Sequence, residues 1–228
     1  MEAGRLARIV AALAQEGPPD PTAYPGRVCS VAVGLLGMTG AGLTLMGEGE
    51  PGALWASDEV ADRIEQAQLT LGEGPGPDAF SSGAPVLEPD LAGASSRWPF
   101  FCPAALDLGV GALFALPLQV GAARLGVLDL CRNGPGFLTD DELADALVLA
   151  DVTTQDLLDL QALGEIPWGE WDVRGQRARV HQATGMIAAQ LDSSTTNALA
   201  RLRAHAFSTG STIYDVADDV ISRRFRFS

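Results

Sequence analysis

The sequence predicts an α+β protein in two parts: an antiparallel sheet with flanking helices, followed by a C-terminal all-α unit of three helices. Three observations carry this prediction. Short apolar runs with glycine-rich turns lie between helical stretches in residues 1–163, a break rich in Gly and Trp follows at 164–172, and three amphipathic stripes fill 173–228. A length of 228 residues and a hydrophobic content of 47% allow two globular domains.

Helices are expected at both ends of the first part. Apolar residues at 6, 9, 10 and 13 recur at helical spacing, and a second helical run extends from about Arg27 to Leu36 before Gly37. At the other end, Thr139 and Glu142 form a capping box that opens a helix over 140–163. The N-terminal helix and the 140–163 helix are candidates either for packing on their own sheet or for pairing two copies of the chain.

The middle of the first part changes to strand periodicity. Strands are expected at 41–46 and 53–57, joined by a turn at 47–52, and a hairpin is expected from 111–120 and 124–131. Asp58 is placed to cap an intervening helix. The Gly-Pro run at 72–77 lacks the Lys-Ser/Thr of a nucleotide-binding loop, so it is interpreted as a structural turn.

Three apolar stripes organise the C-terminal unit. Thr212 and Asp215 resemble a capping box, Gly210 is a helix stop, and residues 192–194 supply cap candidates for the helix before it. The stripes comprise Val180, Ala183, Ile187 and Leu191, then Thr195, Ala198, Leu199, Leu202 and Ala206, then Ile213, Val216, Ala217, Val220 and Ile221. Such short helices bury a small common core.

The order of these C-terminal motifs resembles the ANTAR module, a three-helix RNA-binding domain of bacterial transcription antiterminators. The resemblance rests on the runs at 180–187, 198–206 and 213–221. The preceding part resembles the GAF sensor domains that come before ANTAR modules, on the runs at 56–58, 68–75, 85–91, 97–99 and 125–130. Gly76 departs from that pattern, because similar proteins often carry Cys there.

The GAF resemblance implies a small-molecule pocket between the sheet and the overlying loops. No particular cofactor is indicated, and aromatic side chains in such a domain are also natural core residues. The pocket candidates are Trp98, Phe100, Phe101, Cys102, Phe114 and Asp129. An enclosed apolar cavity is expected between the 98–102 segment and the strand around Phe114.

The ANTAR resemblance implies hairpin RNA as the partner. Arginine suits RNA contact because its planar fork binds phosphate and stacks on unpaired bases. Thr184 stands where Lys is usual, His205 where Tyr is common, and the 209–211 turn lacks basic residues. The candidate RNA-binding residues are Arg179, Thr184, Gly185, Arg201, Arg203, His205, Arg223 and Arg224.

Charge and composition narrow the function class. Residues 173–228 hold eight Arg and four Asp, whereas residues 1–172 hold seven Arg and 25 acidic residues. A basic tail behind an acidic body is expected if only the tail meets phosphate. No catalytic or metal-binding motif and no membrane segment is visible. Three unpaired Cys indicate reduced thiols in a cytoplasmic protein.

These observations predict a cytoplasmic, homodimeric, non-enzymatic regulator that couples GAF sensing to hairpin-RNA binding in transcription antitermination. The alternative is a sensory or scaffold protein whose ANTAR-like tail serves dimerisation alone, which the departures at 184, 205 and 209–211 favour. A DNA-binding helix-turn-helix is a third hypothesis, since the short helices and the Gly210 turn allow it.

Overall fold

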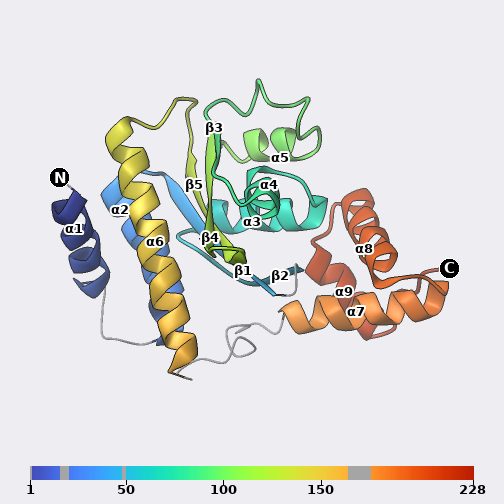
Figure 1. Cartoon of the computed structure of the whole chain (residues 1–228). Coiled ribbons are helices and arrows are strands. Elements are labelled where there is room, and N and C mark those ends of the chain that lie inside the picture. The colour runs from blue at the N-terminus through green and yellow to red at the C-terminus, as the bar shows by residue number, and fades with distance from the viewer. Residues whose placement is uncertain (1, 16–20, 48–49, 164–175) are drawn as a thin grey trace.

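The computed structural model describes residues 2–15, 21–47, 50–163 and 176–228. They form a sheet domain and a separate helical domain (Figure 1). The elements of the sheet domain are α1 (Glu2–Gln15), η1 (Pro21–Ala23), α2 (Tyr24–Leu36), β1 (Gly40–Gly47), β2 (Glu50–Ala56), α3 (Glu59–Leu71), α4 (Pro75–Ser82), β3 (Val86–Glu88), α5 (Phe101–Asp107), β4 (Ala112–Val120), β5 (Ala123–Arg132) and α6 (Asp140–Ala162). The helical domain comprises α7 (Gln176–Leu191), α8 (Thr195–Thr209) and α9 (Ile213–Ile221). The predicted fold class is confirmed.

The sheet is antiparallel throughout and has the order β2-β1-β5-β4-β3. Its two faces follow the period of two along each strand. Phe114, Leu128 and Leu130 join the core under α1, α2 and α6, whereas Leu113 and Val127 face α3, α4 and α5 on the other side. Both faces of the sheet are therefore covered by helices, as the two sides of the sheet in Figure 1 show.

Local signals place most of the helix ends. The side chain of Asp58 accepts a hydrogen bond from the Ala61 amide at the start of α3, and Gly37 ends α2 with a left-handed φ of 62°. The capping box of Thr139 and Glu142 is formed at the start of α6. These three expectations are confirmed.

Two boundaries differ from the sequence prediction. Strand β2 begins at Glu50, inside the region expected to be a turn, and Pro51 pairs with Met46 beside a register shift. An edge strand tolerates proline because one side of its backbone has no strand partner. The Gly-Pro run also continues into a helix, since Pro75 occupies the first turn of α4, where a missing amide costs nothing.

The C-terminal helices pack as predicted from their stripes. Their core includes Ala183, Leu202, Ile213 and Val220, all with 0% exposed surface. Ser194 caps α8 by accepting from the Asn197 amide, and both halves of the Thr212–Asp215 capping box are present. Gly210 ends α8 with a φ of 65°. The expected linker at 164–172 lies outside the described residues, so the predicted domain boundaries stay predictions.

Candidate functional site

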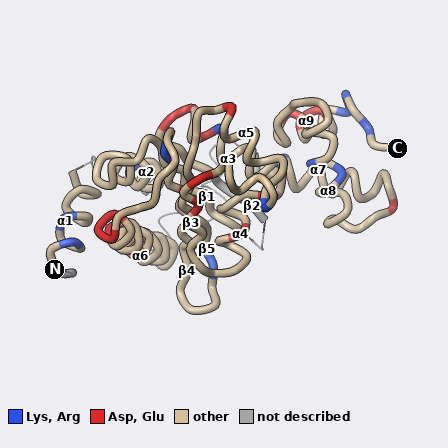
Figure 2. The backbone as a smooth tube through the Cα atoms, turned by 90° about the horizontal axis from the view of Figure 1, so that it is seen from above, with Lys and Arg blue, Asp and Glu red and all other residues tan. Residues whose placement is uncertain are grey.

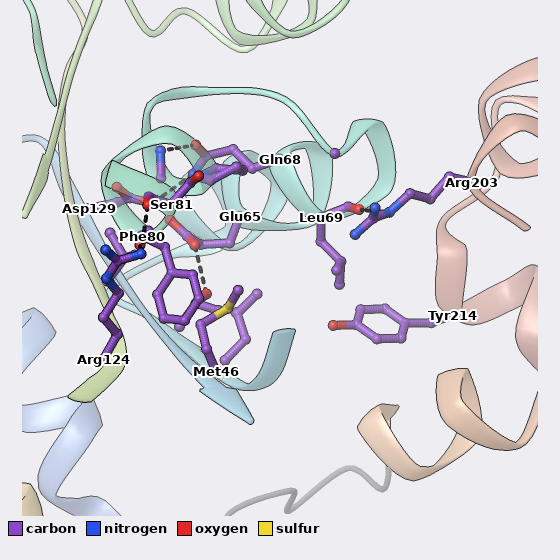
Figure 3. Close-up of a pocket in the computed structure, with 16 residues that line it drawn as sticks. Met46, Glu65, Gln68, Leu69, Phe80, Ser81, Arg124, Asp129, Arg203 and Tyr214 are labelled. Carbon is purple, nitrogen blue, oxygen red and sulfur yellow. Dashed lines mark hydrogen bonds between the residues drawn. The ribbon is translucent and has the colours of Figure 1, made fainter. Parts of the chain in front are cut away.

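A cavity of about 370 Å³ lies between the two domains, bounded by the sheet, α3 and α4 on one side and by the helical domain on the other (Figure 3). Its volume falls in the range of small-molecule sites. The residues that line it are Thr44, Met46, Leu54, Glu65, Gln68, Leu69, Gly72, Gly76, Pro77, Phe80, Ser81, Arg124, Val127, Asp129, Arg203 and Tyr214.

Two buried carboxyl groups form the polar wall of this cavity. Glu65 extends from α3 and Asp129 from β5, and their exposed fractions are 4% and 2%. The hydroxyl of Thr44 donates to Glu65 Oε2 over 2.8 Å, and Gln68 Nε2 donates to Asp129 Oδ2 over 2.7 Å. Asp129 Oδ1 is buried and has no hydrogen-bond partner within the described part of the chain. A buried carboxylate oxygen requires a donor, which is either the proton of the neighbouring Glu65 carboxyl or a group on a bound ligand.

Close backbone approach makes room for the pair. A Cβ at Gly42 would lie 2.4 Å from Glu65 Oε1, and a Cβ at Gly76 would lie 2.7 Å from Asp129 Oδ2. The Gly76 amide also donates to Gln68 Oε1 over 2.7 Å. Glycine at position 76 therefore lets the α4 backbone cover the carboxyl groups directly. A larger side chain at this position would collide with Asp129.

The ionisation of one carboxyl group depends on that of the other. Burial, reinforced by the Asp129 carboxylate, raises the pKa of Glu65 well above its ordinary value of 4.5. Burial also raises the pKa of Asp129, from 3.8 to about 6, although hydrogen bonds from Glu65 and Gln68 oppose the rise. Burial of two adjacent carboxyl groups therefore favours a state in which they share one proton over the doubly ionised pair.

Apolar side chains and two arginines complete the walls. Arg124 Nη1 donates to the carbonyls of Phe80 and Ser81, over 2.8 and 2.6 Å, at the C-terminal end of α4. That contact satisfies carbonyls left open by the helix end. Figure 3 shows Met46 and Phe80 beside the acid pair and Tyr214 across the opening from Leu69.

The helical domain contributes directly to this site. Arg203 Nε donates to the Leu69 carbonyl over 3.1 Å, and the Leu69 side chain belongs to the apolar core of α7, α8 and α9. The rings of Phe100 and Phe207 meet edge to face across the same boundary, with centroids 4.9 Å apart. Helix α3 thus carries Glu65 into the cavity and, one turn later, Leu69 into the neighbouring domain.

The structure places the predicted pocket residues differently, with Asp129 the one that lines the cavity. Trp98, Phe101 and Cys102 are buried in the core under α3 and α5, and Phe114 is buried on the opposite face of the sheet. These four side chains are therefore packed in the protein's core and do not line the cavity between the domains. Phe100 is 54% exposed and contacts Phe207.

Polar anchors explain why the 98–102 segment is core. Trp98 Nε1 donates to Asp78 over 3.2 Å, and the amides of Phe100 and Phe101 donate to Glu73 Oε1 over 2.7 and 2.8 Å. The Glu73 carboxylate thereby caps the start of α5. Sequence reasoning identified the segment but not the acids that fix it.

The predicted RNA-contact residues divide into three groups. Arg201 and Arg223 are exposed and form no ion pair within the described residues, and Gly185 is exposed on α7. Arg179 pairs with Asp218 over 2.5 Å and Arg224 with Asp219 over 2.7 Å. Arg203, Thr184 and His205 are engaged inside the molecule. Figure 2 shows the cationic C-terminal segment beyond α9.

The internally engaged residues have clear partners or surroundings. Thr184 is 3% exposed and its hydroxyl has no hydrogen-bond partner within the described residues. The His205 ring stacks on Phe225 with centroids 4.1 Å apart and meets Phe227 edge to face at 5.5 Å. The Phe227 amide donates to Gln190 on α7, so the C-terminal segment folds back over α8.

Cysteines, metal-binding groups and membrane-spanning helices add no further candidate site within the described residues. All three cysteines are buried and unpaired, and burial raises the pKa of Cys102 to about 11 and of Cys131 to about 12. Over the described ranges, no three His, Cys, Asp or Glu side chains are grouped to hold a metal ion. No described helix has the length and apolar character to cross a membrane.

Comparison with known proteins agrees with this architecture. Residues 26–157 match the GAF domain family and residues 174–221 match the ANTAR domain family, which confirms both resemblances. Both families are regulatory domains. No curated protein matches the chain.

Solved structures similar to the chain include GAF domains of phosphoenolpyruvate-protein phosphotransferases. The one from Coxiella burnetii has 16% identity and a TM-score of 0.54, over 72% of this chain and 97% of that chain. The one from Acinetobacter has 13% identity and a TM-score of 0.52, over 73% and 98%. Free methionine-R-sulfoxide reductase from Neisseria meningitidis, solved with its substrate, has 16% identity and a TM-score of 0.50, over 71% and 91%. At these identities the likeness shows the fold alone.

Proposed function

Because the chain belongs to the GAF domain family and carries a C-terminal ANTAR domain, we propose that it is a signal-responsive regulator that binds hairpin RNA in transcription antitermination. One observation supports the coupling most strongly: Arg203 and Tyr214 of the ANTAR domain line the cavity of the GAF domain. A molecule in that cavity touches both domains, so its binding free energy depends on how they dock. The proposed role is regulatory rather than catalytic, and a transcript as partner implies a cytoplasmic location.

The proposed RNA surface is the exposed cationic side of the ANTAR domain. Arg201 and Arg223 are free to meet phosphate, and Gly185 allows close backbone approach on α7. The ion pairs of Arg179 and Arg224 are solvent-exposed, with arginine side-chain exposures of 54% and 64%. Exposed pairs are worth little, so phosphate can displace the aspartates.

Gel-shift titration with hairpin RNA from the leader of the protein's own operon tests this proposal. Binding should weaken with salt, because each neutralised phosphate releases counterions. Arg201→Ala should weaken binding and flatten the salt slope by about one unit. Arg63→Ala, which removes an exposed arginine from the GAF domain, is the matched control and should change neither quantity. Salt-independent binding, or none by the folded protein, contradicts the proposal.

A scaffold function is the second candidate, and the ANTAR geometry gives a specific reason for it. Five of the eight predicted RNA contacts are engaged within the molecule: Arg179 and Arg224 by aspartates, Arg203 by Leu69, His205 by the C-terminal phenylalanines, and Thr184 by burial. A scaffold would bind no RNA in the titration above. Duplex DNA as competitor separates RNA recognition from a helix-turn-helix function.

We propose that two copies of the chain associate through helix α1. Leu6 and Val10 lie one turn apart on α1 and are 46% and 48% exposed, next to α6 at the side of the molecule away from the ANTAR domain. Ile9 is 0% exposed and belongs to the protein's own core, so it is unsuited to an interface. A dimer would present two ANTAR domains, and the second RNA contact would become intramolecular.

A further inference from the structure

The buried end of the cavity is acidic. Glu65 and Asp129 are the buried acidic groups there, and apart from the proton that it can share with Glu65, Asp129 Oδ1 has no hydrogen-bond donor among the described residues. Thr44 and Gln68 each donate to one oxygen of a carboxyl group, so neither of them satisfies the second oxygen. The missing complement is a cationic group with several N–H bonds, and an ammonium group meets that need.

The rest of the cavity wall favours a short apolar body attached to that ammonium. Met46, Leu54, Leu69, Phe80 and Val127 line the space beside the acid pair. The two arginines that also line it have donors directed at backbone carbonyls, Arg124 at the end of α4 and Arg203 at Leu69. An anionic ligand would lie against the buried negative charge, so the electrostatics disfavour it.

We propose that the cavity binds a small amphipathic amine, with its ammonium on Glu65 and Asp129 and its carbon chain directed toward Tyr214 of the ANTAR domain. The inference rests on the proposed function in taking this cavity as the sensing site. It adds the ligand class and makes helix α9 part of the binding wall. Amine binding is then coupled to the docking of the ANTAR domain, because Tyr214 and Leu69 face each other across the opening (Figure 3).

Proton release accompanies this binding. Burial favours one shared proton on the acid pair, whereas an arriving ammonium favours the doubly ionised form. The charged and titratable groups around the pair are Asp62 on its own helix, Cys29 on α2, Cys131 on β5, and the cavity cations Arg124 and Arg203. Burial raises the pKa of both cysteines, so the carboxyl pair is the source of the proton.

Isothermal titration calorimetry with n-hexylamine, n-hexanol and hexanoate on the full chain tests the proposal. Hexylamine should bind with release of up to one proton, measured as a heat difference between two buffers of unlike ionisation enthalpy. Binding should strengthen about fourfold for each methylene from butylamine to hexylamine. Binding of hexanoate in preference to hexylamine, or of hexanol equally well, overturns the proposal.

Two sets of variants test the acidic pair and the ANTAR wall of the cavity separately. Glu65→Gln and Asp129→Asn should each weaken hexylamine at least tenfold, and the matched control Glu59→Gln, exposed on the same helix, should leave binding unchanged. Tyr214→Ala should weaken hexylamine severalfold, whereas Arg201→Ala on the exposed side of the same domain should not. Circular dichroism verifies that each variant is folded. If Tyr214→Ala binds as wild type does, the ANTAR wall is refuted.

This titration contains no RNA, so its outcome is independent of the gel shift. A protein that binds hexylamine but no hairpin keeps the amine site and loses the antitermination function. A protein that binds the hairpin but no amine keeps that function and refutes the inference.

Discussion

Replacing Asp129 by Asn should stabilise the protein by an amount that increases with pH. The folded-state pKa of Asp129 is raised above its unfolded value, so the folded state favours the protonated carboxyl. The stability that this protonated form contributes is fully present below the unfolded pKa of about 4 and is lost as pH rises through the folded pKa of about 6. Asparagine carries no such titration, so it avoids the loss.

The magnitude follows from that rise in pKa. A shift from 3.8 to about 6 corresponds to roughly 3 kcal/mol lost from the free energy of unfolding above pH 7, at about 1.4 kcal/mol per pKa unit. About two-thirds of this loss, ~2 kcal/mol, falls between pH 4.5 and 7.5. Changed hydrogen bonding to Gln68 adds an offset that does not vary with pH.

Urea denaturation of wild type and Asp129→Asn at several pH values from 4.5 to 7.5 measures the difference directly. The variant should gain ~2 kcal/mol relative to wild type across this range, and Glu65→Gln should change in the same direction because the two groups share a proton. Thr184→Val is the control, since its effect involves no titrating group and should be equal at every pH. A difference between Asp129→Asn and wild type that is constant, or that falls as pH rises, refutes the shared-proton account.

Further outcomes follow from single contacts. Thr184→Val should raise the free energy of unfolding by about 1 kcal/mol, measured by urea denaturation, because it removes a buried hydroxyl without a partner. Gly76→Ala should weaken hexylamine binding by calorimetry, because its Cβ would lie 2.7 Å from Asp129 Oδ2; unchanged affinity would argue against this fit. Val10→Asp should shift the protein from dimer to monomer in light scattering, and a monomeric wild type at micromolar concentration would remove the dimer proposal. Phe100→Ala should speed amide exchange in α8 severalfold, through loss of an interdomain ring contact of roughly 0.5–1 kcal/mol.

Elements set by local signals could be predicted from the sequence. The capping boxes at Thr139 and Thr212, the caps at Asp58 and Ser194, and the apolar stripes of the C-terminal helices all act within a few residues. Strand β3 and helices α4 and α5 were harder, because their ends depend on distant partners. Glu73, for example, caps α5 from a position 28 residues before its start.

The site could be predicted only in part for the same reason. The acid pair joins Glu65 and Asp129 from different elements, and nothing in either local pattern shows that both are buried. The glycine at position 76 permits close approach to Asp129, but the sequence around it does not indicate an acid pair. Trp98 and Phe101 are candidates from the sequence because they are aromatic, yet aromatic side chains fill cores as readily as pockets. Arg203 looked like an RNA contact because charge alone does not reveal which face of a domain is docked.

The central claim is that occupancy of the cavity changes RNA binding, and a single linked measurement tests it. Hairpin-RNA affinity should be determined by fluorescence anisotropy with and without saturating hexylamine, for wild type and for Glu65→Gln. The account predicts at least a threefold change in affinity for wild type, a matching change in hexylamine affinity when RNA is present, and no change for Glu65→Gln. Equal RNA affinity in wild type with the cavity filled and empty would contradict it.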